Sequence, residues 1–354
     1  MRGSFASLLL VSTTRATAFA WPRCGSTNHV LFQRSSQRMS LRPSKARTVS
    51  NGASPPPPTS IRGGAATSSL GSAPGVIFDN APMVLGQSII IGANLLGFGI
   101  SLFTTSHAHV DLLGTGAFAV AALPTLLNGK LPLRVRLSSA AVLTWSTKLA
   151  SFLFYRILHS GHDARLDDIL SDPKNAAGFW IFSLAWGILC SLPHALGTTS
   201  SAAGRPLALA AGGALFGVGL LTETTADYQK WVFKQQHPGE FCNTGLWSLS
   251  QHPNWFGNLL LWSGILLMNA PALIAPVSPK ASFWRKALSY KRIGIALISP
   301  MFMFYLFQGQ ASGSITDALS SSYKRYGYGT DTGYTQYIDT TPLLFPNPLQ
   351  WFQK

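Results

Sequence analysis

The chain has 354 residues, of which 47% are hydrophobic and only 11% are charged. Soluble domains carry about 25% charged residues, so this composition favours a membrane protein. It excludes a disordered chain, which needs low hydrophobicity, and a small disulfide scaffold, because only three cysteines are present.

The net charge of +15 is unevenly distributed. Residues 1–78 contain nine Lys and Arg and no Asp or Glu, which leaves 18 basic and 12 acidic residues, net +6, for the remainder. Basic charge that is concentrated in a leader does not indicate a nucleic-acid interface, which needs a basic patch on the folded domain. We therefore expect no nucleic-acid partner.

The first 75 residues have the features of two targeting segments in tandem. Residues 1–18 combine Arg2, a short apolar run and small residues before a cleavage point, in the order of a signal peptide. Residues 19–75 are rich in Ser, Thr, Arg and Pro, which is typical of a transit peptide or a disordered linker. The junction at 16–22 resembles that of bipartite plastid leaders and predicts a plastid membrane. A secretory signal leading to the endoplasmic reticulum and a mitochondrial presequence are the alternatives.

The rest of the chain repeats runs of roughly 20 apolar residues, the length that crosses a bilayer. No run alternates like a strand, and an open sheet edge has no partners in lipid, so we predict an all-α polytopic transmembrane bundle of about seven helices. The predicted segments are 83–104, 111–128, 136–158, 177–197, 205–222, 254–276 and 291–309. We assign 76–134 to N-terminal helices, 135–346 to the main domain and 347–354 to a tail.

Two charged features accompany the third segment. The loop around Asp163 and Arg165 is either a solvated turn or part of a site. Lys148 lies near the middle of an apolar helix, where an ammonium is costly and normally faces a partner inside the bundle. Glu223 is the candidate partner.

The fifth segment continues into a charged stretch. Glu223, Asp227, Lys230 and Lys234 are spaced by 4, 3 and 4 residues, so a helix places them on one stripe. The stripe is either an amphipathic helix end with weak ion pairs or a surface for one ligand. Carboxylates followed by lysines suit a ligand with a hydroxyl-rich part and a phosphate part.

The sixth segment opens with polar residues. Pro253 suits the first helical position, which makes His252 the cap, and the free N–H groups of such a helix start attract anions. Asn254, Asn258 and Trp262 then share one face, where amides either contact a ligand or join helices in the membrane. No paired Cys and His spacing accompanies His252, so we expect no metal site.

The C-terminal stretch places Lys324 and Arg325 near Tyr334 and Tyr337. Aromatic residues beside basic ones form either an interfacial belt or a clamp for a flat heteroaromatic ring and its phosphates. No Gly-rich Rossmann fingerprint, Walker motif or nucleophile elbow occurs. A nucleotide would therefore be bound by helix ends and loops.

Over about 135–346 the chain resembles the DUF1295 branch of the steroid 5-alpha-reductase C-terminal family. The resemblance is carried by Trp145, Lys148, Leu149, Arg156, Gly161, Asp163, Ala164, Arg165, Phe179, Trp180, Leu192, Pro193, Glu223, 226–230, 245–248, 252–257, Tyr334, Tyr337 and 341–342. It implies a bundle of six or seven helices related to the isoprenylcysteine methyltransferase fold. Members of the family use NADPH to reduce a carbon–carbon double bond conjugated to a carbonyl, in a lipid-like substrate that enters from the bilayer.

The resemblance also implies roles for individual residues. Asp227 and Asn254 would hold the ribose and nicotinamide end of NADPH. Lys234 with Lys324 or Arg325 would hold its phosphates. The remaining cofactor contacts implied are Asp163, Arg165, Lys230, Trp247, His252 and Tyr337, and the catalytic residues implied are Glu223, Asn258 and Tyr334. Hydride addition to an enone develops charge on the carbonyl oxygen, so the site needs a donor there and a dry slot.

The chain departs from the family pattern at several positions. Gln251, Trp255 and Asn258 occupy places where the family usually has Arg, Tyr and Glu, and an amide cannot supply the charge of a carboxylate. A further Glu expected after 312–313 is missing, and Asp317 stands one position out of register. An S-adenosylmethionine-dependent methyltransferase and a non-catalytic membrane scaffold or lipid-binding protein are therefore the alternatives to a reductase.

Overall fold

The computed structural model describes residues 77–104, 108–160, 166, 169–315 and 318–347. The predicted leader segments 1–18 and 19–75 lie outside these ranges, as do Asp163, Arg165 and Asp317. The described chain is built from helices, with one isolated antiparallel bridge between Phe78 and Ser200.

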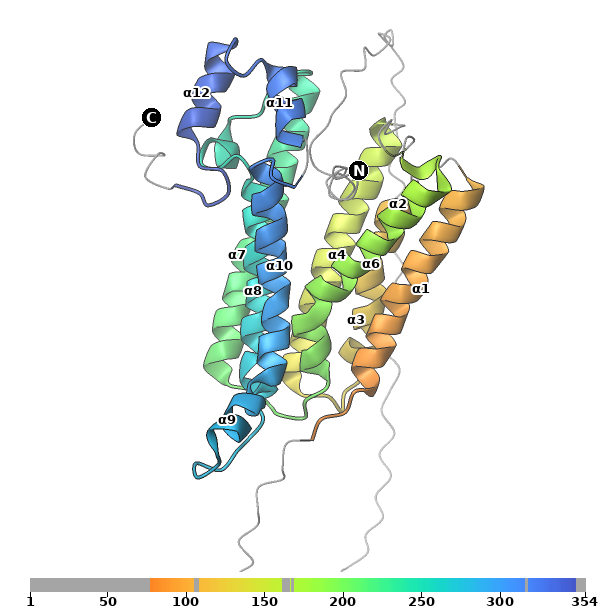
Figure 1. Ribbon diagram of the computed structural model, residues 1–354, viewed down its shortest axis with the longest axis vertical. Helices are drawn as coiled ribbons and strands as arrows, with labels where there is room; N and C mark the ends of the chain where they lie inside the picture. Colours follow the sequence, from red (N-terminus) through yellow and green to blue (C-terminus); the bar gives the residue numbers. More distant parts are fainter. Residues whose placement is uncertain (1–76, 105–107, 161–165, 167–168, 316–317, 348–354) are drawn as a thin grey trace, which may run out of the picture. The chain divides into compact units, whose positions relative to one another are not determined.

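Six of the seven predicted apolar segments each form one helix, and the segment 111–128 forms two, α2 and α3 (Figure 1). In chain order the elements are α1 (Ala81–Phe103), α2 (Ala108–Gly114), α3 (Ala117–Leu127), α4 (Leu133–Ser160), α6 (Pro173–Thr198), α7 (Pro206–Gln236), the 3-10 helix η2 (Gly245–Ser248), α8 (Pro253–Leu273), α9 (Phe283–Ser289), α10 (Lys291–Ala311), α11 (Ala318–Tyr326) and α12 (Thr332–Thr340). The prediction of an all-α polytopic bundle is confirmed.

Six helical segments of the described chain are long and apolar enough to cross a membrane, one fewer than the seven predicted. They are α1, α2 with α3, α6, α7, α8 and α10. The remaining predicted segment, α4, has 28 residues and the length of a span, but it carries Arg134, Arg136, Lys148 and Arg156. It packs against α3, α6, α7 and α8, and its Arg134 and Lys148 side chains have partners within the protein.

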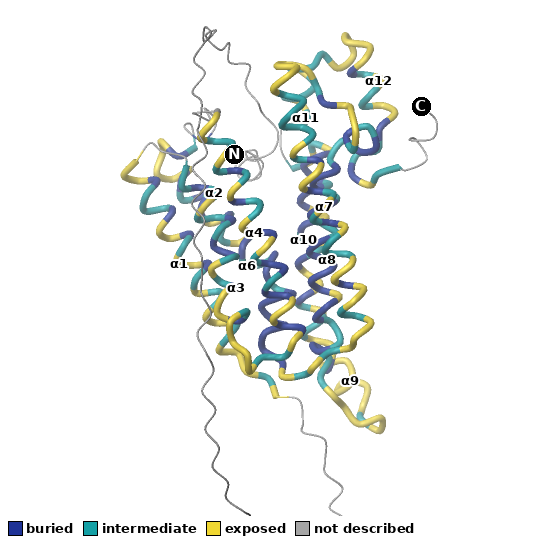
Figure 2. Tube along the Cα trace, turned by 180° about the vertical axis from the view of Figure 1, so that it is seen from behind, coloured by how far each residue is buried: buried dark blue, intermediate teal, exposed yellow. Residues whose placement is uncertain are grey.

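Helix α8 is the centre of the bundle. In its most apolar stretch 61% of the residues are buried, whereas the corresponding fraction is 17% in α1 and in α7. Figure 2 shows the buried residues of the bundle in dark blue. A helix buried on nearly all sides has protein neighbours all round, whereas α7 buries one face and leaves the rest to lipid. The polar residues of α8 are therefore inside the protein.

Helices α7 and α8 touch through their backbones because glycines face each other. A Cβ atom built on Gly212 or Gly219 of α7 would lie 2.6 Å from the carbonyl oxygen of Gly264 or Gly257 of α8. Small residues at such positions let membrane helices approach closely. The contact sets the register that places Glu223 beside Gly257, one turn from Asn254.

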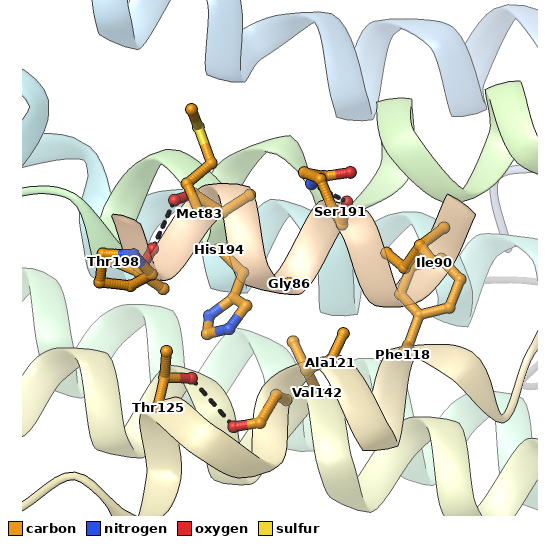
Figure 3. Close-up of a pocket in the computed structure, with 14 residues that line it drawn as sticks. Met83, Gly86, Ile90, Phe118, Ala121, Thr125, Val142, Ser191, His194 and Thr198 are labelled. Carbon is orange, nitrogen blue, oxygen red and sulfur yellow. Dashed lines mark hydrogen bonds between the residues drawn. The ribbon is translucent and has the colours of Figure 1, made fainter. Parts of the chain in front are cut away.

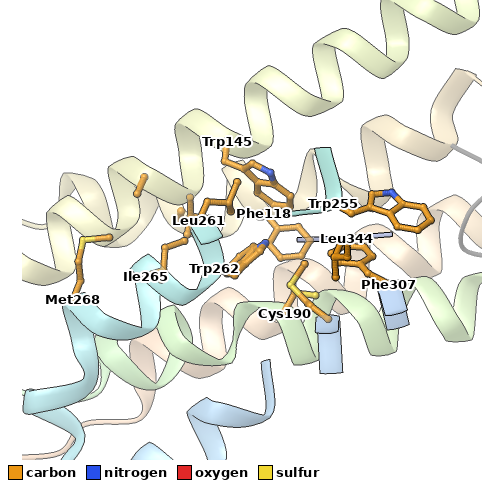
Figure 4. Close-up of a cluster of buried hydrophobic side chains, with 14 of the residues drawn as sticks. Phe118, Trp145, Cys190, Trp255, Leu261, Trp262, Ile265, Met268, Phe307 and Leu344 are labelled. Carbon is orange, nitrogen blue, oxygen red and sulfur yellow. The ribbon is translucent and has the colours of Figure 1, made fainter. Parts of the chain in front are cut away.

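Aromatic side chains fill the core where α3, α4 and α8 meet (Figure 4). The ring centroids of Trp145 and Trp262 are 5.1 Å apart at 77°, and those of Phe118 and Trp145 are 5.3 Å apart at 86°. These edge-to-face contacts are the favoured geometry for aromatic pairs. They hold α4 against α8 one helical turn from Lys148 of α4 and Asn258 of α8.

The C-terminal segment is fastened to the loop that precedes α8. The Gln251 side chain donates to the carbonyls of Ile338 at 3.0 Å and Thr341 at 2.7 Å, and Ser250 Oγ donates to the carbonyl of Leu344 at 2.9 Å. Helices α11 and α12 consequently lie at the end of the bundle where α7 ends and α8 begins, opposite α9 (Figure 1). Gln251 thus connects the C-terminal segment to the start of α8.

A small cavity between α1, α3, α4 and α6 is lined mainly by apolar groups (Figure 3). Its volume is about 20 Å³, close to what a single water needs. Its polar side chains are mostly paired: Gln87 Nε2 donates to Ser191 Oγ at 2.9 Å, and His194 Nδ1 lies 2.7 Å from Ser138 Oγ. This cavity is too small and too apolar for a substrate site.

The glycine contact predicts opposite behaviour for two adjacent residues. Gly212→Ala places a methyl group against the α8 backbone, and such overpacking costs about 1–3 kcal/mol, so we expect a lower melting temperature in detergent. Gly213→Ala is the matched control because no atom lies within 4 Å of its Cβ position, and it is expected not to lower the melting temperature. Equal destabilisation by both substitutions would contradict the contact.

Candidate functional site

The predicted carboxylate stripe of α7 faces the predicted amide face of α8. Asp227 of the stripe lies between Lys148 of α4 and Asn254 of α8. Its Oδ2 is 3.2 Å from the Lys148 ammonium, and its Oδ1 accepts from Asn254 Nδ2 at 3.1 Å. One turn deeper, Glu223 Oε1 accepts from Asn258 Nδ2 at 3.1 Å and from Trp145 Nε1 at 3.4 Å. The tertiary structure therefore joins α4, α7 and α8 through one polar cluster.

Lys148 contacts both carboxylates of this cluster. Its Nζ lies 3.9 Å from Glu223 Oε2, which agrees with the predicted pairing, but the closer partner is Asp227. Two carboxylates share one ammonium, so these three side chains together carry an excess negative charge when all are ionised. Inside a membrane protein such a charge is costly unless a proton or a ligand compensates it.

The cluster has more hydrogen-bond acceptors than donors. Glu223 Oε2, Asn254 Oδ1 and Asn258 Oδ1 are buried, and none accepts a hydrogen bond from the part of the chain that the structure describes. Leaving buried polar atoms unsatisfied costs about 1–3 kcal/mol each. Unpaired acceptors next to carboxylates can receive the hydroxyl or amide hydrogens of a ligand.

Above the cluster, the outer end of the stripe lines a cavity of about 90 Å³. Lys230 Nζ lies 4.3 Å from the ring centroid of Trp247, and Lys234 Nζ donates to the Tyr326 hydroxyl at 3.0 Å. None of the described residues that line this cavity is Asp or Glu. Two ammonium groups among aromatic rings suit an anionic ligand with a flat ring.

The predicted tyrosine clamp forms part of the wall of this cavity. Phe241 lies between Tyr334 and Tyr337, with ring centroids 5.0 and 5.4 Å away, and the Tyr337 hydroxyl donates to the Trp247 carbonyl at 2.9 Å. Burial raises the pKa of both phenols above the ordinary value. The two tyrosines are therefore neutral hydrogen-bond donors near pH 7.

His252 lines the same cavity in the loop before α8. Its ring stacks on Trp255 with centroids 4.0 Å apart, and Trp255 stacks on Phe307. Burial, assisted by the charge of Lys230, lowers the pKa of His252 to about 3. His252 occupies the predicted cap position, but its side chain makes no capping hydrogen bond, so the ring remains a neutral cavity group.

The structure separates the predicted phosphate ligands into two groups. Lys230 and Lys234 line the cavity, whereas Lys324 is exposed on α11 and Arg325 lies 5.8 Å from the Tyr326 ring without lining the cavity. Sequence reasoning did not find Gln310, which is 2% exposed in the cavity wall. A single amide near the end of an apolar helix has no distinctive spacing, so no local signal could have found it.

A sequence model of the family described as "Protein of unknown function (DUF1295)" matches residues 97–341, more than half of the chain. The match includes the whole of α4, α7, α8 and α12, and so all of the cluster and every described residue of the cavity wall. No curated protein and no solved structure matches the chain.

The Lys148–Asp227 contact predicts energetic coupling between α4 and α7. We expect Lys148→Met and Asp227→Asn each to lower the free energy of unfolding, and the double variant to lose less than the sum by about 1–3 kcal/mol. The reason is that Lys148→Met leaves both carboxylates without their cation, whereas Asp227→Asn leaves the ammonium only its longer, 3.9 Å contact with Glu223. A control cycle that pairs Asp227→Asn with Lys174→Met, at an exposed position on α6, is expected to be additive. Additivity in both cycles would contradict the ion pair.

The lowered pKa of His252 predicts a pH dependence. Because the folded-state pKa of about 3 is below the unfolded value of about 6.5, the unfolded chain binds more protons between these limits. The contribution of His252 to stability is thus complete above pH 6.5 and is lost as the pH falls toward 3. We expect the melting temperature of the native protein to fall more steeply from pH 6.5 to 4 than that of His252→Gln. Parallel curves would show that the histidine is not held neutral.

Proposed function

The chain belongs to the DUF1295 family, and on this premise we propose that it is a membrane-embedded NADPH-dependent reductase. The reaction proposed is reduction of a carbon–carbon double bond conjugated to a carbonyl in a lipid, sterol or isoprenoid. The observation that carries the proposal is the division of the α7 stripe into two parts. The inner part, with Glu223 and Asp227, is rich in hydrogen-bond acceptors, and the outer part, with Lys230 and Lys234, is cationic and surrounded by aromatic rings.

The two parts of the stripe suit the two kinds of group in a dinucleotide. Glu223 and Lys234 are eleven residues apart, which corresponds to about 16 Å along a helix. Asp227 and Asn254 would receive ribose hydroxyls, because Asn254 Oδ1 is buried and unpaired among the described residues. The ammonium groups of Lys230 and Lys234, which line the cavity, would neutralise phosphates.

The residues also suit the proposed chemistry. When bound, NADPH supplies the hydride. Reduction of an enone develops negative charge on the carbonyl oxygen, which a preorganised donor must stabilise. Tyr334 is 3% exposed, lines the cavity and keeps its proton because burial raises the pKa of its phenol, so we assign it this role.

Asn258 stands where the resemblance leads one to expect Glu, and the inner part of the site still carries the carboxylate of Glu223. Its amide donates to Glu223, which keeps one carboxylate at this depth. Two carboxylates in this contact would repel each other, whereas an amide and a carboxylate form a hydrogen bond. Glu223 and Asn258 are therefore proposed to act as a pair that positions the reacting groups.

The substrate and the location of the protein follow from the same proposal. Six membrane-crossing helices make the chain an integral membrane protein, whose neighbour is the lipid bilayer. A lipid-like enone can reach the bundle laterally from that bilayer. The leader composition supports a plastid membrane, and the endoplasmic reticulum is the alternative.

The test is ligand-induced stabilisation of the full chain in detergent. A ligand that binds only the native state at 100 times its Kd stabilises it by about 2.7 kcal/mol. We expect NADPH, but not S-adenosylmethionine, to raise the melting temperature. Asp227→Ala should abolish this increase, and Asp339→Ala, which removes an exposed carboxylate on α12, should preserve it.

Other outcomes would replace the proposal. An increase with S-adenosylmethionine alone would indicate a methyltransferase. No increase with either compound, in protein that unfolds cooperatively, would indicate a scaffold or lipid-binding protein.

A further inference from the structure

Gln310 is a buried amide without a partner in the wall of the cavity. It lies in the last turn of α10, and Ala311, Trp255 and Leu319 line the same cavity. Neither Nε2 nor Oε1 makes a hydrogen bond to any residue that the structure describes. Both the donor and the acceptor function of this side chain are therefore unused.

Other buried amides near the site are at least partly satisfied. Asn254 and Asn258 donate to carboxylates, and Asn269 donates to Ser138 and to a backbone carbonyl. An unpaired buried amide destabilises the fold, and a methionine of similar volume would avoid that cost. The exception at Gln310 indicates that its partner is a ligand rather than the protein.

We propose that Gln310 is the residue that recognises the ligand of this cavity, by pairing its amide with a donor and an acceptor that lie side by side on a planar group. The inference rests on the proposed NADPH site. NADPH offers this chemistry twice, at the carboxamide of the nicotinamide ring and at the amino edge of adenine. Gln pairs with adenine through such a bidentate contact.

Two analogues distinguish these sources. The 3-acetylpyridine analogue of NADPH replaces the carboxamide donor by a methyl group, and the hypoxanthine analogue replaces the adenine amino group by a carbonyl. Loss of one buried hydrogen bond weakens binding about tenfold. We expect full-length protein in detergent to bind one of the analogues about tenfold more weakly than NADPH, and the weakened analogue identifies the group that Gln310 contacts.

The variant Gln310→Met tests whether Gln310 is responsible. It should bind NADPH about tenfold more weakly and lose its discrimination against the affected analogue, because a thioether cannot make the paired contact. Without ligand its melting temperature should equal or exceed that of the native protein, since an unpaired buried amide has been removed. Gln308→Met, on the same helix but outside the cavity wall, should bind all three dinucleotides as the native protein does.

Two results would overturn the proposal. One is unchanged NADPH affinity and analogue discrimination in Gln310→Met. The other is a lower melting temperature of ligand-free Gln310→Met, which would show that the amide has a structural partner. Absence of NADPH binding by the native protein is a different result, because it contradicts the proposed function itself.

Discussion

The backbone contact between α7 and α8 is the constraint on which the site depends. Glycines at 212, 219, 257 and 264 leave no room for a side chain between the two helices. At this separation the carboxylates of α7 reach the amides of α8 directly, with Asp227 and Asn254 3.1 Å apart. Larger residues would separate the helices and break these hydrogen bonds, so the glycines determine the chemistry as well as the packing.

The polar cluster illustrates how a membrane bundle tolerates charge. Lys148, Glu223 and Asp227 lie at an interface of three helices, where each charge has an opposite charge nearby. Aromatic packing of Trp145 against Trp262 supports α4 at the same level. Three buried acceptors on the faces that meet at the site, Glu223 Oε2, Asn254 Oδ1 and Asn258 Oδ1, accept no hydrogen bond from the described residues. This is the arrangement expected when a ligand completes the hydrogen bonding.

The departures from the family pattern have separate structural consequences. Gln251 keeps the long polar side chain of the family's Arg but donates to carbonyls of the tail, so it fastens the C-terminal segment without adding charge to the cavity. Asn258 gives Glu223 a donor in place of a second carboxylate. At both positions an amide stands where the resemblance leads one to expect a charged side chain, and both amides make hydrogen bonds that hold elements of the site together.

The sequence alone determined the helical class, the positions of the apolar segments and the α7 stripe, because apolar length and helical spacing are local properties. It also indicated the partner of Lys148 and the shared face of Asn254 and Asn258. Tertiary structure decided that Asp227 is the closer partner, that Lys324 and Arg325 lie outside the cavity wall, and that Gln310 lies within it. These outcomes depend on distances between helices far apart in the chain, which are set by packing and leave no periodic trace in the sequence.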